Sequence, residues 1–347
     1  MCSSSNAVLT HHSTRCLTPT ISQHTFHHLP QDQGQFSWRP SQYLQLQLPA
    51  GLDLIGGERA LDDERRRIRV TPCNPPSRKT RSGRDGEHEY GDEQEAGDEA
   101  VVFITRNGSV TGLLGLPRFR SLTVQVVGVG GGFTPEDLST CSLPPTPPPL
   151  PPSGLVCVAG GIGICVFLPS PLSPCDRDDT RTRMRRTLLW SLHADDIDLV
   201  SHLLQRRLLD PCQWTTMHIF LTSGAEAFEQ ESVAPLGSKC DDIAARVRRS
   251  GPSAATLSFT FGRMTMDDLF SAAVAEDGGH EKGETTKDAL LANTAGAPTI
   301  CFCGSKSLEW QVKMWALKMT PACRVHTTQL QKWTGIQKME RRVHRQN

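Results

Sequence analysis

The sequence predicts an α+β chain of two domains, an antiparallel β-barrel followed by an α/β domain with a parallel sheet. Short β-prone runs dominate the first part, such as the alternating YLQLQL at 43–48 and the continuous VVFIT at 101–105. Strands then alternate with helices after residue 152, which is typical of a parallel sheet covered on both faces. Between the strand-rich region and the region of alternating strands and helices, the segment LPPTPPPLPP at 143–152 indicates a stiff, extended linker.

The elements follow in order along the chain. Residues 1–35 are an N-terminal segment that could supply the first barrel strand, and residues 36–142 form the barrel, with a further strand at 122–127. The insertion at 78–97 has almost no apolar residues, so we expect it to be disordered. The α/β domain takes residues 153–335, before a basic tail at 336–347, and its expected strands are 156–159, 187–190, 217–222, 256–259 and 299–303, with helices at 195–206, 266–275 and 307–318.

Charge and cysteine content exclude several classes of protein. Lys+Arg and Asp+Glu both number 37, so the balance predicts no binding to nucleic acid. The longest apolar run, at 155–168, is glycine-rich and too short to span a bilayer, which takes roughly 20 residues. The 12 cysteines show no CxxC spacing and the start has no signal-peptide pattern, so we expect a cytoplasmic protein with reduced thiols and no metal site.

One glycine-rich turn carries the strongest chemical signal. In VCVAGGIGI at 156–164, an apolar strand runs directly into Gly160, Gly161 and Gly163. Glycines let a backbone turn sharply and approach a pyrophosphate closely, although the same pattern also occurs in plain tight turns. Prolines at 169, 171 and 174 predict that the helix after this turn is short or replaced by a loop.

Several segments, read in order, resemble those of one enzyme family. FSWRPSQY at 36–43 has Ser41 where the family usually has glycine, and ITRNGSVTGLL at 104–114 is similar to its strand and following turn. The other matching segments are VVGVGGGF at 126–133, AGGIGI at 159–164, LWSLHADD at 189–196, GR at 262–263 with DDL at 267–269, and CGS at 303–305. Together they resemble ferredoxin-reductase-like flavoproteins of the fungal type, which join an FAD-binding FR-type barrel to an NAD-binding domain.

The resemblance implies an FAD site on the barrel. Residues 65–71 (RRRIRVT) stand where the family has R-x-Y-S/T, so Arg69 and Thr71 are implied to bind FAD, with valine in place of the tyrosine. The turn of Gly108, Val110 and Thr111 is implied to present backbone N–H groups and a hydroxyl to the flavin pyrophosphate. A solvated basic edge is the alternative interpretation of residues 65–71.

It also implies a nicotinamide site on the α/β domain. Gly160, Gly161, Gly163, Gly304 and Ser305 are implied to bind the dinucleotide, with Cys303 as the catalytic neighbour of the nicotinamide. The alternative for Cys303 is an ordinary buried thiol. Glu226 follows the third strand of this domain and could accept a hydrogen bond from a ribose hydroxyl, which favours NADH over NADPH.

The implied activity is that of an NAD(P)H-dependent flavin oxidoreductase. Hydride would pass from NAD(P)H to FAD, and electrons onward to a small molecule, oxygen or a separate redox protein, because the chain shows no iron–sulfur, haem or FMN module. The alternative is a catalytically degraded member of the fold that acts as a protein-interaction scaffold, with 143–152 as the ligand of an aromatic groove.

Overall fold

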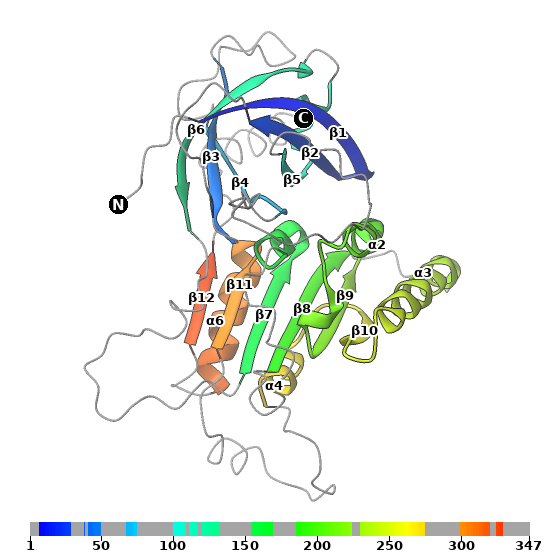
Figure 1. The fold of residues 1–347 in the computed structure, drawn as a ribbon. Helices are drawn as coiled ribbons and strands as arrows, with labels where there is room; N and C mark the ends of the chain where they lie inside the picture. Colours follow the sequence, from blue (N-terminus) through cyan, green and yellow to red (C-terminus); the bar gives the residue numbers. More distant parts are fainter. Residues whose placement is uncertain are drawn as a thin grey trace, which may run out of the picture.

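The computed structural model describes residues 7–28, 38, 41–49, 67–74, 100–108, 111–116, 119–131, 154–168, 185–223, 230–274, 299–319 and 324–328. These residues form two six-stranded sheets, one antiparallel and one parallel (Figure 1). The predicted fold class is therefore confirmed. The insertion at 78–97, the proline-rich stretch at 143–152 and the tail at 336–347 lie outside the described residues.

The antiparallel sheet closes into a barrel. Its strands run in the order β4-β3-β6-β1-β2-β5, so β4 and β5 are its two ends. An antiparallel bridge between Pro72 and Phe103 joins these ends, and the Cys73 N–H donates to the Val102 carbonyl at 2.8 Å. The strands are β1 (Val8–Thr18), β2 (Ile21–His28), β3 (Tyr43–Gln47), β4 (Arg67–Val70), β5 (Ala100–Arg106) and β6 (Thr123–Gly130).

The barrel includes residues 8–28, from the N-terminal segment that the sequence analysis considered as a source of the first barrel strand. Both β1 and β2 lie inside the sheet, between β6 and β5, so this segment supplies two strands and not one. Alternate residues face the barrel core, where Phe26 of β2 packs edge-on against Phe103 of β5 with ring centroids 5.5 Å apart. The hairpin is therefore part of the core of the barrel.

The parallel sheet changes direction at its centre. Its order is β10-β9-β8-β7-β11-β12, so the chain builds outward from β7 to β10 and then returns to the other side of β7. In open α/β sheets, ligands bind at the carboxyl ends of the strands where the order reverses, here between β7 and β11. The strands are β7 (Gly154–Gly160), β8 (Arg185–His193), β9 (Thr216–Thr222), β10 (Thr256–Phe261), β11 (Thr299–Cys303) and β12 (Arg324–Thr328).

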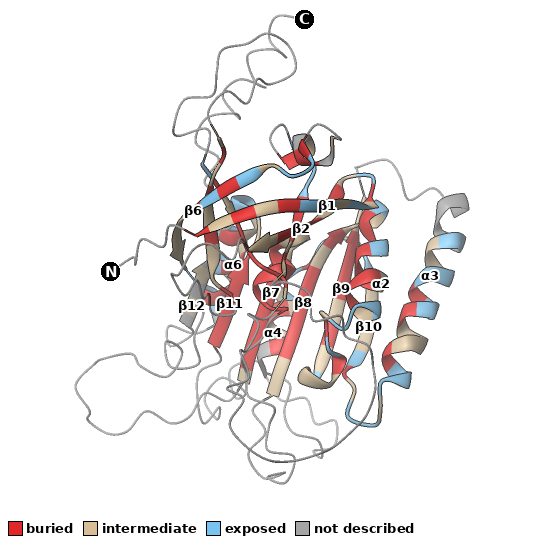
Figure 2. Ribbon diagram, turned by 45° about the horizontal axis from the view of Figure 1, so that its top comes forward, coloured by how far each residue is buried: buried red, intermediate tan, exposed pale blue. Residues whose placement is uncertain are grey.

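Helices cover both faces of this sheet. Alternate residues of β7 enter two different apolar cores: Ala159 packs in the core that includes the α3 residue Ile243, and Val158 in the core that includes the α6 residue Val312. Figure 2 accordingly shows β7 and β11 buried along most of their length. The helices are α2 (Asp198–Gln205), α3 (Gln230–Arg249), α4 (Met266–Val274) and α6 (Lys306–Met319).

Within the described part of the chain, none of the helices has the length and apolar character needed to cross a membrane.

The turn after β7 is shorter than an ordinary first helix. A 3-10 helix, η3 (Gly161–Val166), follows the strand directly, and prolines stand soon after it. This agrees with the prediction of a short helix at this place. Its residues Ile164, Cys165 and Val166 are buried against the sheet and the barrel.

Candidate functional site

The two glycine-bearing segments meet at the direction change of the parallel sheet. Strands β7 and β11 are neighbours, with Ala159 in register with Cys303. Because parallel strands end at the same edge of a sheet, the turn after β7 and the turn after β11 come together. The structure therefore brings Gly160, Gly161, Gly163, Gly304 and Ser305 together at this edge of the sheet, and their role in binding a dinucleotide stays a prediction.

Two of these glycines permit close packing of the turns. A Cβ at Gly163 would overlap the carbonyl oxygen of Cys303. A Cβ at Gly160 would lie 3.2 Å from the Gly304 Cα, which is tighter than ordinary packing. Gly163 thus needs to be glycine and Gly160 favours it, because the turn after β7 lies directly against the end of β11.

Gly161 differs from its neighbours because it faces open space. Its φ of +54° is left-handed, and among the described residues no atom beyond its chain neighbours lies within 4 Å of the position that a Cβ would take. The indole N–H of the fully buried Trp190, on β8, donates to the Gly161 carbonyl at 2.9 Å. This hydrogen bond holds the turn on its buried side. The backbone at Gly161 is therefore held in place and open to a ligand on its outer side.

Helix α6 begins at the same place. The Ser305 hydroxyl accepts from the Leu308 N–H at 3.3 Å, and the Ser305 carbonyl accepts from the Glu309 N–H at 2.9 Å, so Ser305 caps the helix. The Ser305 backbone nitrogen lies 3.6 Å from the Cβ position of Gly160. The partial positive charge of a helix N-terminus favours an anion at this edge.

The thiol of Cys303 is buried in the apolar core. Its side chain is fully buried, in the same cluster as Cys165 of η3. A hydrogen bond with Cys73, burial and the neighbouring Cys303 thiol raise the pKa of Cys165 well above its ordinary range. These surroundings keep the Cys165 thiol neutral, and the full burial of Cys303 favours the buried-thiol alternative, with the Cys303 backbone along the turn.

The barrel residues of the implied flavin site are only partly available to a ligand. The Arg69 guanidinium lies 5.1 Å from the centroid of the Tyr43 ring, in cation–π contact. Thr71 is buried, and its hydroxyl has no hydrogen-bond partner among the described residues. A buried hydroxyl without a partner is costly, so a ligand that hydrogen-bonds Thr71 would relieve that cost.

The turn after β5 differs from what the sequence analysis expected. Thr111 is buried, and its hydroxyl donates to the Arg106 carbonyl at 2.6 Å and accepts from the Gly108 N–H at 3.0 Å. The hydroxyl proton and that N–H are therefore used within the turn. Val110 lies outside the described residues.

Ser41 shows why its position favours glycine. Its φ is 63°, in the left-handed region that a residue with a side chain seldom adopts. The sequence analysis noted serine here in place of the glycine that is usual in the resembled family. The backbone keeps the glycine-like conformation, and Ser41 is buried at the entry to β3.

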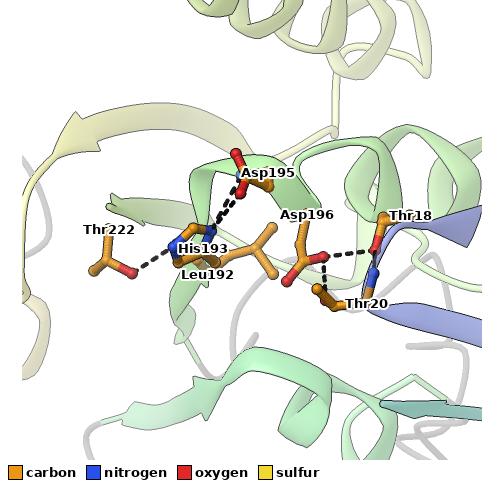
Figure 3. Close-up of polar contacts among 7 residues, drawn as sticks. All are labelled: Thr18, Thr20, Leu192, His193, Asp195, Asp196 and Thr222. Atoms are coloured by element: carbon orange, nitrogen blue, oxygen red, sulfur yellow. Dashed lines mark hydrogen bonds and ion pairs between the residues drawn. The ribbon is translucent and has the colours of Figure 1, made fainter. Parts of the chain in front are cut away.

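Polar contacts that the sequence analysis missed join the barrel to the α/β unit. Asp196 is buried after β8, and its Oδ1 accepts from the hydroxyls of Thr18 at 2.6 Å and Thr20 at 2.7 Å (Figure 3). The His202 Nε2–H on α2 donates to the Gln23 Oε1 on β2 at 2.7 Å. Asp196 lies in the matched segment LWSLHADD, but nothing in that segment reveals a partner far away in the sequence.

A buried histidine pair was also missed. The Thr14 hydroxyl lies 2.9 Å from the His11 Nε2 and 2.8 Å from the His24 Nδ1, and the His11 Nδ1 lies 3.1 Å from the Phe119 carbonyl. Burial lowers the pKa of both histidines, that of His24 to about 4. The pair thus links β1 and β2 to the segment that follows the Gly108–Thr111 turn.

The comparisons with known proteins give low-identity likenesses. No family model matches the sequence, and no curated protein is significantly similar to it. Flavohemoglobin from Malassezia yamatoensis, with bound FAD and heme, superposes with a TM-score of 0.45 at 10% identity, over 94% of this chain and 60% of its own. The CS-b5R domains of human Ncb5or in the NAD+ form give 0.44 at 11% identity, over 92% and 68%. Phthalate dioxygenase reductase gives 0.42 at 13% identity, over 93% and 67%. This chain thus spans 60% of the length of the flavohemoglobin.

Proposed function

We propose that this protein is an NAD(P)H-dependent flavin oxidoreductase, which uses FAD and passes electrons to a separate acceptor. The observation that carries the proposal is the open backbone at Gly161, which lies at the direction change of the sheet beside the N-terminus of α6. A site of this kind suits a dinucleotide pyrophosphate. NAD(P)H would supply the hydride and FAD would accept it, so the protein needs to bind and orient rather than to act as acid or base.

The dinucleotide would be held by the two turns at the end of β7 and β11. Gly161 offers an approachable backbone, and Gly160, Gly163 and Gly304 bring the turns close enough to share one ligand. Ser305 fixes the start of α6, whose N-terminus complements the phosphate charge. Cys303 would contribute its backbone to this wall and its thiol to the core behind it.

The flavin would lie against the adjoining end of the barrel. Cys73 is buried in the same apolar cluster as Ile164 and Cys165 of η3, so the segment after β4 faces the turn at Gly160–Gly163. Thr71 stands two residues before Cys73 and offers the unpartnered hydroxyl, and Arg69 brings positive charge on the same strand end. Thr111 would act by holding the shape of the Gly108–Val110 turn, since its own hydroxyl is engaged there.

Flavin absorption and stopped-flow reduction test the proposal. Purified protein should bind added FAD, show flavin absorption and be bleached by NADH or NADPH. Gly161→Ala places a methyl group where the phosphate would approach, so we expect reduction to slow by about a hundredfold, the effect of a misplacement of about 1 Å. Gly251→Ala, at a position that also has a positive φ (+132°) and an open Cβ site among the described residues, is the matched control and should reduce at the parent rate.

The same measurements distinguish the alternative. A preparation that takes up no FAD would overturn the enzyme proposal and support the scaffold. If the Gly161→Ala variant binds flavin normally and its flavin is reduced as fast as that of the parent, the dinucleotide binds elsewhere.

A further inference from the structure

Helix α6 carries an apolar surface that the fold leaves exposed. Trp310 is 65% exposed, Leu317 is 69% exposed and Met314 is 36% exposed. Their spacing of four and three residues places them on one side of the helix. Aromatic residues and methionine are enriched where proteins bind one another, and large apolar side chains gathered on one face are unusual on a surface without a partner.

The opposite side of α6 explains why this face is not needed for folding. Val312 and Ala316 are buried against the parallel sheet, in the core that includes Ile300 and Phe302 of β11. Trp310, Met314 and Leu317 are absent from that core and from its partly buried neighbours. The helix is thus held by one side, and the apolar side that faces outward has no role in its packing.

The charge on the exposed face selects the kind of partner. Lys306, Lys313 and Lys318 are the charged residues exposed on α6, and they lie within one helical turn of the apolar side chains. The single carboxylate of the helix, Glu309, is buried and pairs with Lys313 at 2.7 Å. A second copy of α6 would bring lysines toward lysines, whereas an acidic partner would be attracted.

We propose that this face of α6 binds an acidic amphipathic helix of another protein. Apolar residues of the partner at helical spacing would pack against Trp310, Met314 and Leu317, and its flanking carboxylates would meet the lysines. Fourteen residues make a face about 21 Å long, which suits a small, transient interface. The proposal does not depend on the oxidoreductase function, since it concerns a surface outside the nucleotide site.

Fluorescence anisotropy with a defined probe tests this interaction. The probe is a labelled peptide in which leucines follow one another at alternating intervals of three and four residues, with glutamate at the other positions. A scrambled peptide of the same composition is the comparison. We expect the full chain to bind the periodic peptide at least about tenfold more tightly, with affinity falling as salt rises. Equal binding of both peptides, or no binding, would overturn the proposal.

Variants locate the binding on α6. Trp310→Ser with Leu317→Ser should weaken binding by about tenfold or more, because buried anchors carry most of the energy of such interfaces. Lys306→Glu with Lys318→Glu should weaken binding of the periodic peptide and remove the gain in affinity at low salt. Phe261→Ser is the control, since Phe261 is 42% exposed on β10 at the far edge of the sheet, and it should bind as the parent does.

Two further measurements keep the outcome decisive. Thermal melts should be the same for the parent and the variants, and Trp310→Gln alone replaces the double variant if that one melts early. Sedimentation of the parent should show no concentration-dependent dimer. A dimer that disappears in Trp310→Ser with Leu317→Ser would assign the face to a second copy and overturn the acidic partner.

Discussion

His24 sits in the barrel with hydroxyl partners on both ring nitrogens, Thr14 on one side and Thr105 on the other. Burial lowers its pKa from 6.5 to about 4. Between these pH values the unfolded chain binds a proton at His24 that the folded chain does not. The stability that this histidine contributes is therefore complete above pH 6.5 and is lost as the pH falls toward 4, by roughly 3 kcal/mol in all.

Replacing His24 should remove this part of the pH dependence. Between pH 7 and pH 4.5, we expect the free energy of unfolding of the parent to fall by roughly 2 kcal/mol more than that of His24→Asn, as measured by urea denaturation. Ser13→Asn, at an exposed position of β1 that carries no titratable group, is the control and should keep the slope of the parent. Parallel curves for the parent and His24→Asn would contradict the prediction.

At the residue scale, the sequence predicted the placement of backbone segments better than the surroundings of side chains. Glycine spacing at 160–163 reflects local backbone geometry, and the structure brings those residues beside Gly304. Thr111 was expected to face a ligand, yet its hydroxyl bonds Arg106 and Gly108. The orientation of a hydroxyl depends on which acceptor is nearer in three dimensions, and a sequence does not contain that information.

Individual elements follow the same logic. The strand at 299–303 was predicted with the bounds of β11, because a continuous apolar run buried on both faces is typical of a central parallel strand. Helix α3 was missed because Pro235 and Gly237 disfavour a helix in the sequence, although the helix runs through both of them, and because many of its residues are exposed. Strand β12 was missed because RVHTT is a short edge strand without an apolar run.

Strand β8 supports the turn at Gly160–Gly163 through Trp190. Trp190→Phe keeps an aromatic ring in the core but removes the hydrogen bond to the Gly161 carbonyl. We expect a loss of about 1 kcal/mol or somewhat more in stability, and weaker NAD(P)H binding because the turn is less well held. Thermal melts and nucleotide titration of the two proteins measure these effects.

Trp214→Phe is the matched control for that experiment. Trp214 is buried in the same apolar cluster as Trp190, but among the described residues no hydrogen bond joins it to the turn at Gly160–Gly163. It should lose stability with unchanged nucleotide affinity. Equal loss of affinity in both variants would show that the Gly161 contact has no positioning role.

On the scale of the whole molecule, Asp196 couples the barrel to the α/β unit. Asp196→Ala removes the acceptor of the Thr18 and Thr20 hydroxyls, and Thr18 is left buried without its partner. Such a loss costs about 1–3 kcal/mol, so we expect a lower midpoint of thermal unfolding. Asp195→Ala, whose exposed carboxylate lies 3.4 Å from His193, should change stability by no more than about 0.5 kcal/mol. Equal shifts in both variants would contradict a coupling role for Asp196.

The position of β7 at the centre of its sheet has a consequence for synthesis on the ribosome. All six barrel strands lie before residue 131, so a nascent chain can complete the barrel early. Strand β7 follows next, but the partner for one of its edges, β11, is made only at residues 299–303. An apolar strand with an unpaired edge is a template for pairing with another chain. Until residues 299–303 have been synthesised, this edge of β7 therefore stays open to pairing with another chain.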